Sequence, residues 1–440
     1  MFLFFCLWFK VSITDSTVLK SLVWRKIALM NLAISNDQTL QKHLGAKGLI
    51  ALITLLSAFV PLSTDLYLPA LPKMGAQFDA PANVINLTLM LFFIFYSLGT
   101  LIWGPLSDKY GRRPVLLVGM TVYILASVLC ANAWNVYALI VFRVLQAAGG
   151  STAGAVATAI VKDVYDGRRR ESVLALVQSM VLISPAVAPM FGAALLQFTS
   201  WRGVFWCLAI IGVLALLGSA LLQETIHTRS TGGVLHSLRR LGKVLQNPRF
   251  TTLLIVFSLV SVATMAFIAS SSYIYVDGFG LSEQVYSYFF ALNAIGLILG
   301  PWLYLQLSRR FSRLLIVQVC FGVLAASGVL IFLWGRSGPW VFALSLLPAS
   351  IAGVCMRPPG VNLMLNQQNQ DTGSAAALIG CVGLVMGSLG MYIISFNWLN
   401  TVVMLGLLYI LTGLICSLLW VQIIQRIQAG LFVYSEEKNI

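Results

Sequence analysis

Twelve apolar segments dominate the chain, and each is long enough to cross a lipid bilayer as a helix of about 20 residues. They cover residues 48–71, 84–104, 115–133, 135–159, 172–198, 203–222, 251–275, 284–305, 313–334, 339–363, 373–396 and 398–424. Because 59% of the 440 residues are hydrophobic and 10% are charged, a water-soluble protein of this length could not bury the apolar surface. The sequence therefore predicts an all-α polytopic membrane protein with twelve transmembrane helices.

The longest polar interruption divides these segments six and six. We expect an N-terminal extension over 1–47, bundles over 48–222 and 251–424, a linker over 223–250 and a tail over 425–440.

A Gly-Pro pair follows the second segment of each half, at Gly104-Pro105 and at Gly300-Pro301, 196 residues apart. This spacing favours two six-helix pseudo-repeats. Parallel repeats around an axis along the membrane normal are typical of transporters, with the substrate site between the halves.

The positive charges indicate orientation. If each segment switches sides, 23 of the 28 Lys and Arg residues lie on the side of the N-terminus and three on the other, and two lie within segments. Since cytoplasmic loops carry the excess of Lys and Arg, both termini are predicted in the cytoplasm. The net charge of +14 is thus interpreted as a topology signal, with the lipid bilayer and not nucleic acid as partner.

Several functional classes lack the residues that they need. Six of the seven cysteines lie inside apolar segments, no Cys-x-x-Cys pair occurs, and the three histidines lie in polar segments, so neither a disulfide framework nor a metal site is expected. No phosphate-binding loop of the form G-x-x-x-x-G-K-(S/T) occurs. We expect no enzyme, no catalytic residues and no cofactor.

The first 30 residues contain an apolar run of only eight residues, Phe2–Phe9, and a second methionine stands at Met30. We expect a non-essential extension; the alternative is an anchor at the membrane interface.

One acidic residue stands apart from the other thirteen. Asp65 alone lies within an apolar segment, whereas the others lie in loops, tails or segment ends. A carboxylate in hydrocarbon is costly, so Asp65 is expected to face a cavity or to carry a proton. The alternative is a wetted carboxylate at a periplasmic helix end.

Two arginines also lie within segments. Arg143 is predicted at a depth similar to that of Asp65, as its matching cation, with Gln146 one turn away on the same face. The alternative for Arg143 is a structural hydrogen-bond hub. Arg357 precedes Pro358-Pro359-Gly360 near a segment end, and we favour snorkelling to the interface over a substrate role.

Four motifs carry a family resemblance. Residues 104–114 read GPLSDKYGRRP and resemble the loop motif of the major facilitator superfamily, with Lys109 where arginine is usual. Residues 143–149 read RVLQAAG and resemble its R-x-x-Q-G-x-G motif, with Ala147 in place of glycine. Residues 184–192, SPAVAPMFG, resemble the antiporter motif of drug exporters. Residues 63–72, STDLYLPALP, and 288–293, YFFALN, are similar to the bicyclomycin/chloramphenicol-resistance (Bcr/CflA) subfamily.

The resemblance implies a proton-coupled antiporter of the bacterial inner membrane that exports small amphipathic compounds by alternating access, with drugs such as bicyclomycin or phenicols as cargo. The proton gradient would be its energy source and a monomer its form. An exporter of one metabolite, such as a nucleobase, sugar or siderophore, is the alternative, because the motifs do not determine specificity.

Roles follow for four sets of residues. Proton coupling is assigned to Asp65, Arg143 and Gln146. A conformational latch, or else only a positively charged turn, is expected at Gly104, Asp108, Gly111, Arg112 and Arg113. The antiporter motif places a kink at Pro185 and Pro189 that Gly192 accommodates. Substrate contacts are expected from some of Tyr67, Phe93, Tyr96, Phe267, Tyr273, Tyr288, Phe289 and Asn293, although most aromatic side chains in membrane spans face lipid or pack the bundle.

The eleventh segment carries glycines at positions 380, 383, 387 and 390, three or four residues apart. We interpret this stripe as a packing surface for a neighbouring helix.

Overall fold

The computed structural model describes residues 41, 43–226, 234–368, 371–430 and 432, and these residues form helices joined by short connections, with no strand among them. The expected extension over residues 1–30 and most of the tail lie outside the described residues.

The helices of the first half follow the first six segments. They are α3 (Gly45–Ser57), α4 (Phe59–Asp65), η1 (Leu68–Ala70), α5 (Leu71–Phe78), α6 (Ala82–Tyr110), α7 (Arg112–Ala131), α8 (Val136–Val164), α9 (Gly167–Leu195) and α10 (Trp201–Leu221).

The second half begins after a short helix in the linker, which the sequence did not predict. The linker helix is α11 (Val234–Leu245), and the helices of the second half are α12 (Pro248–Ser272), η2 (Tyr273–Gly278), α13 (Glu283–Leu307), α14 (Arg313–Trp334), η3 (Gly335–Ser337), α15 (Pro339–Cys355), α16 (Arg357–Asn366), α17 (Thr372–Ile394) and α18 (Thr401–Gln428).

Among the described residues, eleven helices are long and apolar enough to cross a membrane. A bent pair, Gly45–Ser57 with Phe59–Phe78, brings the number to twelve. The predicted multi-pass architecture is thus confirmed.

The first span is bent by 43° between α3 and α4 instead of running straight. Pro61 has no N–H to donate to the carbonyl of Ser57, so the helical hydrogen-bond ladder is interrupted where α3 ends. The hydroxyls of Thr54 and Ser57 donate to the carbonyls one turn earlier, at 2.8 Å and 2.9 Å, which also favours bending.

Corresponding helices pack against each other in the two halves. In the first half α8 packs on α6 and α7, and α7 also packs on α10; in the second half α15 packs on α13 and α14, and α14 on α18. These are the same three pairs, counted from the start of each half. This equivalence confirms the two pseudo-repeats inferred from the Gly-Pro pairs.

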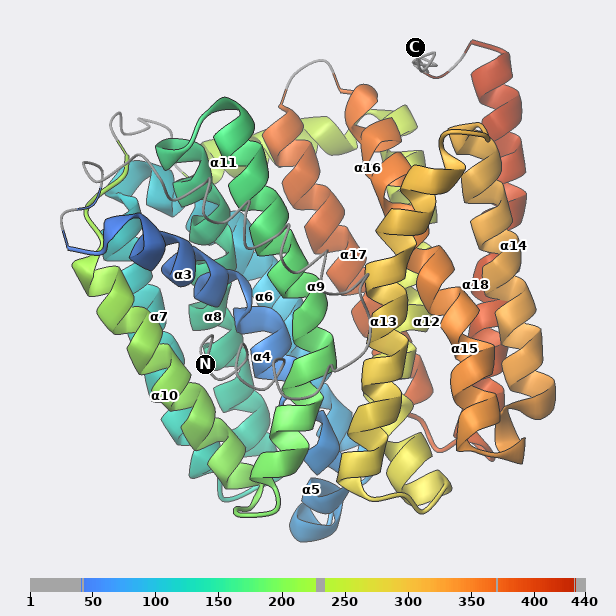
Figure 1. Cartoon of the computed structure of the whole chain (residues 1–440), viewed down its shortest axis with the longest axis horizontal. Helices are drawn as coiled ribbons and strands as arrows, with labels where there is room; N and C mark the ends of the chain where they lie inside the picture. The colour runs from blue at the N-terminus through green and yellow to red at the C-terminus, as the bar shows by residue number, and fades with distance from the viewer. Residues whose placement is uncertain (1–40, 42, 227–233, 369–370, 431, 433–440) are drawn as a thin grey trace, which may run out of the picture.

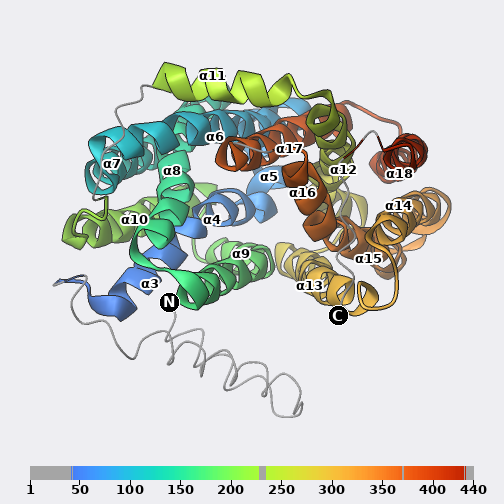
Figure 2. The ribbon, with the colours of Figure 1, turned by 90° about the horizontal axis from the view of Figure 1, so that it is seen from above.

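The halves meet along α9 with α13 and along α6 with α17 (Figure 1). Helix α11 lies across one end of the molecule, where it packs on both α6 and α17 (Figure 2), and α5 lies at the opposite end. We name these the α11 end and the α5 end.

Four polar contacts join the halves toward the α5 end. Lys73 forms an ion pair with Glu283 at 2.7 Å, and Asn86 donates to the Ser395 hydroxyl at 2.8 Å. The hydroxyls of Ser287 and Ser388 donate to the carbonyls of Pro189 and Met90 at 3.1 Å and 3.4 Å.

The expected loops after the second and eighth segments are largely helical, which corrects the sequence prediction. Helix α6 continues through Gly104 and Pro105 to Tyr110, and α13 continues past Gly300 and Pro301 to Leu307. A proline inside a helix removes one hydrogen bond, and here the remaining bonds hold the helix together. The turn comes only at Gly111, whose φ of 106° suits glycine.

Only part of the glycine stripe of α17 packs closely against another helix. A Cβ atom at Gly390 would overlap the backbone carbonyl of Val262 on α12, and one at Gly387 would press on Met265. Around Gly380, by contrast, there is open space. The close approach of α17 to α12 therefore depends on the last two glycines of the stripe.

Replacing Gly390 with alanine should destabilise the protein, because the new methyl group meets backbone that cannot rotate away, and overpacking of this kind costs about 1–3 kcal/mol. Gly380→Ala is the matched control and should leave stability unchanged or slightly improved. Thermal unfolding of the purified variants in detergent measures the difference. Equal unfolding temperatures for the two variants would contradict this account of the packing.

Candidate functional site

Asp65 is the last residue of α4, and only 6% of its surface is exposed. Its carboxylate accepts a hydrogen bond from the Thr64 hydroxyl at 2.9 Å. The same hydroxyl also lies 3.0 Å from the carbonyl of Val60, so its single hydrogen serves two acceptors. No ion pair reaches Asp65 from any described residue. The acid is thus buried with little to stabilise a negative charge.

Arg143, on α8, is fully buried. Its Nη1 donates to the carbonyl of Ser63 at 3.0 Å and to Oε1 of Gln146 at 2.6 Å, and its Nε lies 3.4 Å from the carbonyl of Thr88. The guanidinium carbon lies 4.6 Å from the ring centre of Tyr67. Further rings, of Phe92 and Phe205, lie at 4.2 Å and 5.7 Å.

These three rings stabilise the buried guanidinium in part through cation–π attraction. One nitrogen, Nη2, is buried and has no hydrogen-bond partner among the described residues. Arg143 therefore ties α8 to α4 and α6 through backbone carbonyls and rings.

The expected pairing of Arg143 with Asp65 is not formed. Arg143 does reach α4, so the two residues share a region of the fold, but it binds the carbonyl of Ser63. Two residues along a helix are separated by about 200° of rotation, so the Asp65 side chain leaves α4 in another direction. The guanidinium and the carboxylate have separate surroundings in this structure.

Gln146 extends the arginine network into α7, as a residue one turn from Arg143 can. Its Nε2 donates to the hydroxyl of Ser127 at 2.8 Å. On the same helix, the hydroxyl of Tyr123 shares a hydrogen bond of 2.7 Å with that of Ser63. Sequence reasoning missed Tyr123 and Ser127. They could have been noticed only because each places a hydroxyl group inside an apolar segment.

The predicted latch is an ion cluster within the first half. Arg112 forms ion pairs with Asp108 at 2.5 Å and with Asp163, at the end of α8, at 2.8 Å. Its backbone N–H donates to Glu224, after α10, at 2.8 Å, and that of Arg113 donates to the same carboxylate at 3.2 Å.

The cluster joins the ends of four helices. Sequence analysis predicted Asp108, Gly111, Arg112 and Arg113 but missed Asp163 and Glu224, which are far along the chain. A side chain at Gly111 would collide with Glu224, whereas Gly104 faces open space. Gly104 is therefore not brought into the cluster.

The antiporter motif lies between Asp65 and the second half. A Cβ atom at Gly192 would overlap the carbonyl of Leu66, the residue after Asp65, so α9 lies directly on the end of α4. The carbonyl of Pro189 accepts the hydrogen bond from Ser287 of α13. Pro185 and Pro189 both lie inside the unbroken helix α9.

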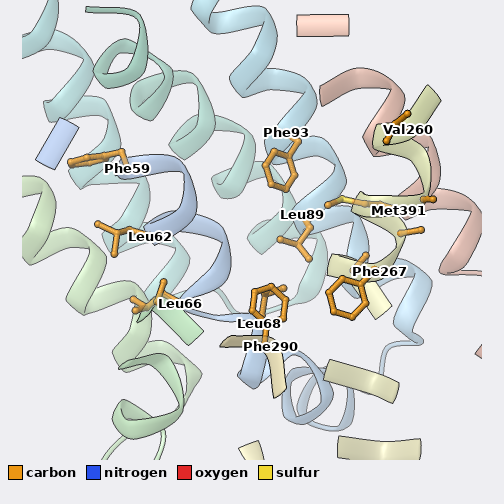
Figure 3. Packing of buried hydrophobic residues seen from close by; sticks show 14 of the residues in the cluster. Phe59, Leu62, Leu66, Leu68, Leu89, Phe93, Val260, Phe267, Phe290 and Met391 are labelled. Carbon is orange, nitrogen blue, oxygen red and sulfur yellow. The ribbon is translucent and has the colours of Figure 1, made fainter. Parts of the chain in front are cut away.

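The predicted substrate residues fall into groups. In the first half, Tyr67 contacts Arg143, and Tyr96 stacks on Phe92 with ring centres 6.1 Å apart. Phe93, on α6, belongs to the cluster of buried hydrophobic residues that Figure 3 shows, together with Leu68, Phe267 and Phe290.

In the second half, Phe267 stacks on Phe290 at 5.8 Å and Phe289 on Tyr275 at 5.0 Å. Asn293 accepts a hydrogen bond from Ser350, and its Nδ2 atom is buried without a partner among the described residues, as is the hydroxyl of Tyr273.

Two residues lie apart from these groups. Tyr288 is 59% exposed and shares a helix face with the exposed Ile295 and Trp302, so it lies on the outer apolar surface. Arg357, at the start of α16, is exposed and forms no ion pair with a described residue.

The fold and this interior define a multi-pass membrane transporter. The family model of the Major Facilitator Superfamily matches residues 53–391. The chain therefore belongs to the major facilitator superfamily.

Known proteins agree with the resemblance to the Bcr/CflA subfamily. A chloramphenicol resistance protein of Pseudomonas aeruginosa is 28% identical over 384 residues, covering 84% of this chain and 91% of its own. A bicyclomycin resistance protein homolog of Haemophilus influenzae is 22% identical over 353 residues, covering 77% and 88%. The crystal structure of a D-xylose-proton symporter superposes with a TM-score of 0.63 at 14% identity, covering 84% of this chain and 96% of that one, and shows the same fold.

Replacing Arg143 with lysine should destabilise the first half. An ammonium group cannot reach Ser63, Thr88 and Gln146 together, and a polar group left unpartnered in the interior costs about 1–3 kcal/mol. Arg336→Lys, on an exposed connection, is the control and should unfold like the parent protein. Thermal unfolding in detergent is the measurement. An Arg143→Lys variant that unfolds at the temperature of the parent protein would show that the hydrogen-bond network of Arg143 does not stabilise the fold.

Replacing Asp163 with asparagine should loosen the ion cluster at the α11 end, because the buried guanidinium of Arg112 loses one of its two anionic partners. Asp166→Asn is the control, because Asp166 is exposed and its side chain forms no capping hydrogen bond at the start of α9. Hydrogen exchange of the first turn of α7 is the measurement. We expect at least a several-fold faster exchange in Asp163→Asn only; identical exchange in both variants would contradict a structural role of the cluster.

Proposed function

We propose that this transporter is a proton-coupled antiporter that exports small amphipathic compounds, with antibiotics of the bicyclomycin and phenicol kind as cargo. The observation that carries the proposal is the setting of Asp65, a carboxyl group buried in a membrane span with one shared hydrogen-bond donor and no cation. A carboxyl group in such a place is far easier to keep neutral than ionised, so it exchanges a proton whenever its access to water changes.

Its position supports coupling to the conformational change. Asp65 ends α4, Leu66 touches Gly192 of α9, and η1, which follows at Leu68, contacts α12 and α13 of the second half. Opening or closing of this interface would alter the surroundings of the carboxyl group. Arg143 acts in this proposal as the anchor that holds α4 in place, with Gln146 as its hydrogen-bond partner.

The cargo class rests on the aromatic interior and on the relatives. Rings bury apolar area without demanding one hydrogen-bond pattern, which suits varied amphipathic compounds. Two relatives are named for resistance to chloramphenicol and bicyclomycin. We assign substrate contacts to Tyr67, Phe93, Tyr96, Phe267, Tyr273, Phe289 and Asn293, and not to Tyr288.

The orientation follows the positive charges. We place the α11 end, both termini and the ion cluster of Arg112 in the cytoplasm, and the chain in a bacterial inner membrane as a monomer that needs no cofactor besides the proton gradient.

Replacing Asp65 with asparagine should abolish the resistance that the expressed protein confers, since the amide cannot release a proton. Asp79→Asn is the matched control: Asp79 is exposed at the end of α5 and its φ of 48° suits asparagine, so resistance should be retained. Growth of a susceptible host with chloramphenicol or bicyclomycin measures the effect, with an uncoupler added in a parallel series. Equal resistance from wild type and Asp65→Asn, unaffected by uncoupler, would overturn the proposal.

A further inference from the structure

Helix α11, in the linker between the halves, lies at the edge of the molecule. Figure 1 shows it running across the ends of the spans, and Figure 2 shows it along the outer edge, beside α6 and α17, on which it packs. Because the spans cross the bilayer, the level at which they end is the level of the lipid headgroups. A helix that lies across this end at the outer edge is therefore next to the membrane surface.

The side chains of α11 divide between two opposite faces. Leu238, Leu241 and Leu245 follow one another three and four residues apart and form an apolar face. Arg239 and Lys243 each stand two residues before one of these leucines, which is about 200° of rotation around the helix. The helix contains no acidic residue. An apolar face opposite a basic one is typical of helices that lie in a membrane interface.

The protein covers only part of the apolar face. Leu241 packs against the core, and the neighbouring Val244 is 3% exposed. Leu238 and Leu245, by contrast, are 40% and 41% exposed. These two leucines are seven residues apart, or two helical turns, so they lie along one edge of the face. Water would leave this edge uncovered, whereas acyl chains beside the protein would cover it.

The charges of the opposite face are not neutralised by the protein. Arg239 and Lys243 are exposed, and neither forms an ion pair with a described residue. Arg240 differs from them, because its guanidinium lies 3.8 Å from the carboxylate of Asp371 at the start of α17. Two unpaired cations on the exposed side of a helix complement an anionic surface.

Polar contacts hold α11 in this orientation. Just after the helix, Nδ2 of Asn247 donates to the carbonyl of Gln367 at 2.7 Å, and Nε2 of Gln368 donates to the carbonyl of Val244 at 3.4 Å. Together with the ion pair of Arg240, these bonds fasten α11 to the connection between α16 and α17. The helix is therefore held against rotation about its own axis, and its two faces keep their directions.

We propose that α11 is an interfacial helix that binds anionic phospholipids. Arg239 and Lys243 contact the headgroup phosphates, and Leu238 and Leu245 lie among the first carbons of the acyl chains. Long basic side chains can extend from the polar face to the phosphates along their aliphatic stems. The exposed leucines beside the basic residues favour a lipid surface over a soluble anion. This inference is independent of the proposed proton coupling and of the cargo.

The test measures hydrogen exchange of the α11 amides in the full chain, with one copy in each nanodisc. One set of nanodiscs contains phosphatidylcholine, which has no net charge, and the other contains phosphatidylcholine with anionic phosphatidylglycerol. Exchange should be at least several-fold slower in the anionic nanodiscs, since each basic residue at an anionic surface favours binding by about fivefold. Raised ionic strength should reduce this difference, because salt screens exposed charges.

Paired substitutions then test the basic face. Arg239→Gln with Lys243→Gln should remove the difference between the two lipids, whereas Arg239→Lys with Lys243→Arg keeps both charges and should retain it. Arg309→Gln with Arg310→Gln is the matched control. Both of these arginines are exposed in the connection between α13 and α14, and their replacement changes the net charge equally. The control should retain the difference.

The apolar face is tested separately. Leu238→Gln with Leu245→Gln should make exchange of α11 faster in both kinds of nanodisc, because the contact with acyl chains does not depend on the charge of the lipid. Both leucines are exposed, so the fold should tolerate the change. Unchanged exchange in this variant would place α11 outside the bilayer and would reject the interfacial position.

Equal exchange of the parent protein in the two lipids would overturn the inference. An equal loss in the control with Arg309 and Arg310 replaced would also overturn it, since the effect would then be one of net charge. Glycerol phosphate dissolved around the neutral nanodiscs should change nothing; protection equal to that from phosphatidylglycerol would assign the basic face to a soluble anion. Protection that requires two copies in one nanodisc, in either lipid, would assign it to a second copy of the chain.

Discussion

The structure depends on how one buried guanidinium is satisfied in a membrane interior. Arg143 is fully enclosed, and no water from a bilayer can solvate it, so the protein must supply its partners. It supplies carbonyls from α4 and α6, the amide of Gln146 and three aromatic rings. A helix carbonyl can accept a hydrogen bond from the arginine only where a bend has removed its helical bond or where its oxygen accepts a second bond in addition to the helical one. The irregular first span and the buried arginine therefore belong together.

The same constraint gives Asp65 its opposite character. Arginine stays charged under all conditions and must be paired permanently, whereas a carboxyl group can become neutral by taking up a proton. In this structure the arginine has several hydrogen-bond acceptors and three rings around it. The carboxyl group of Asp65 accepts one hydrogen bond, from a Thr64 hydroxyl that it shares with the carbonyl of Val60. A fixed charge thus builds the scaffold, and a variable charge lies beside the interface where the two halves meet.

Sequence reasoning was successful where the information is local. Twelve apolar segments gave the spans, the Gly-Pro pairs gave the repeat, and Gly111 gave the turn of the ion cluster. It was wrong about the loop at Gly104, because a proline inside a long helix looks the same in sequence as a helix end. The pairing of Arg143 with Asp65 failed for another reason: equal depth says nothing about which way two side chains point. Asp163 and Glu224 could not be found, since their partner Arg112 lies far along the chain and only the packed register brings them together.

The end of α4 connects the acid to the rest of the molecule. Because α4 ends at Asp65, the next carbonyl, that of Leu66, lies against Gly192, where any side chain would be excluded. Three residues before this glycine, Pro189 cannot donate a hydrogen bond but its carbonyl accepts one from Ser287 of α13. Backbone-to-backbone contact and a hydrogen bond to a helix carbonyl transmit displacement with little slack, because neither has a flexible side chain at the point of contact on α9. A motion of α4 would therefore reach α13 through the antiporter motif over a distance of one helix turn.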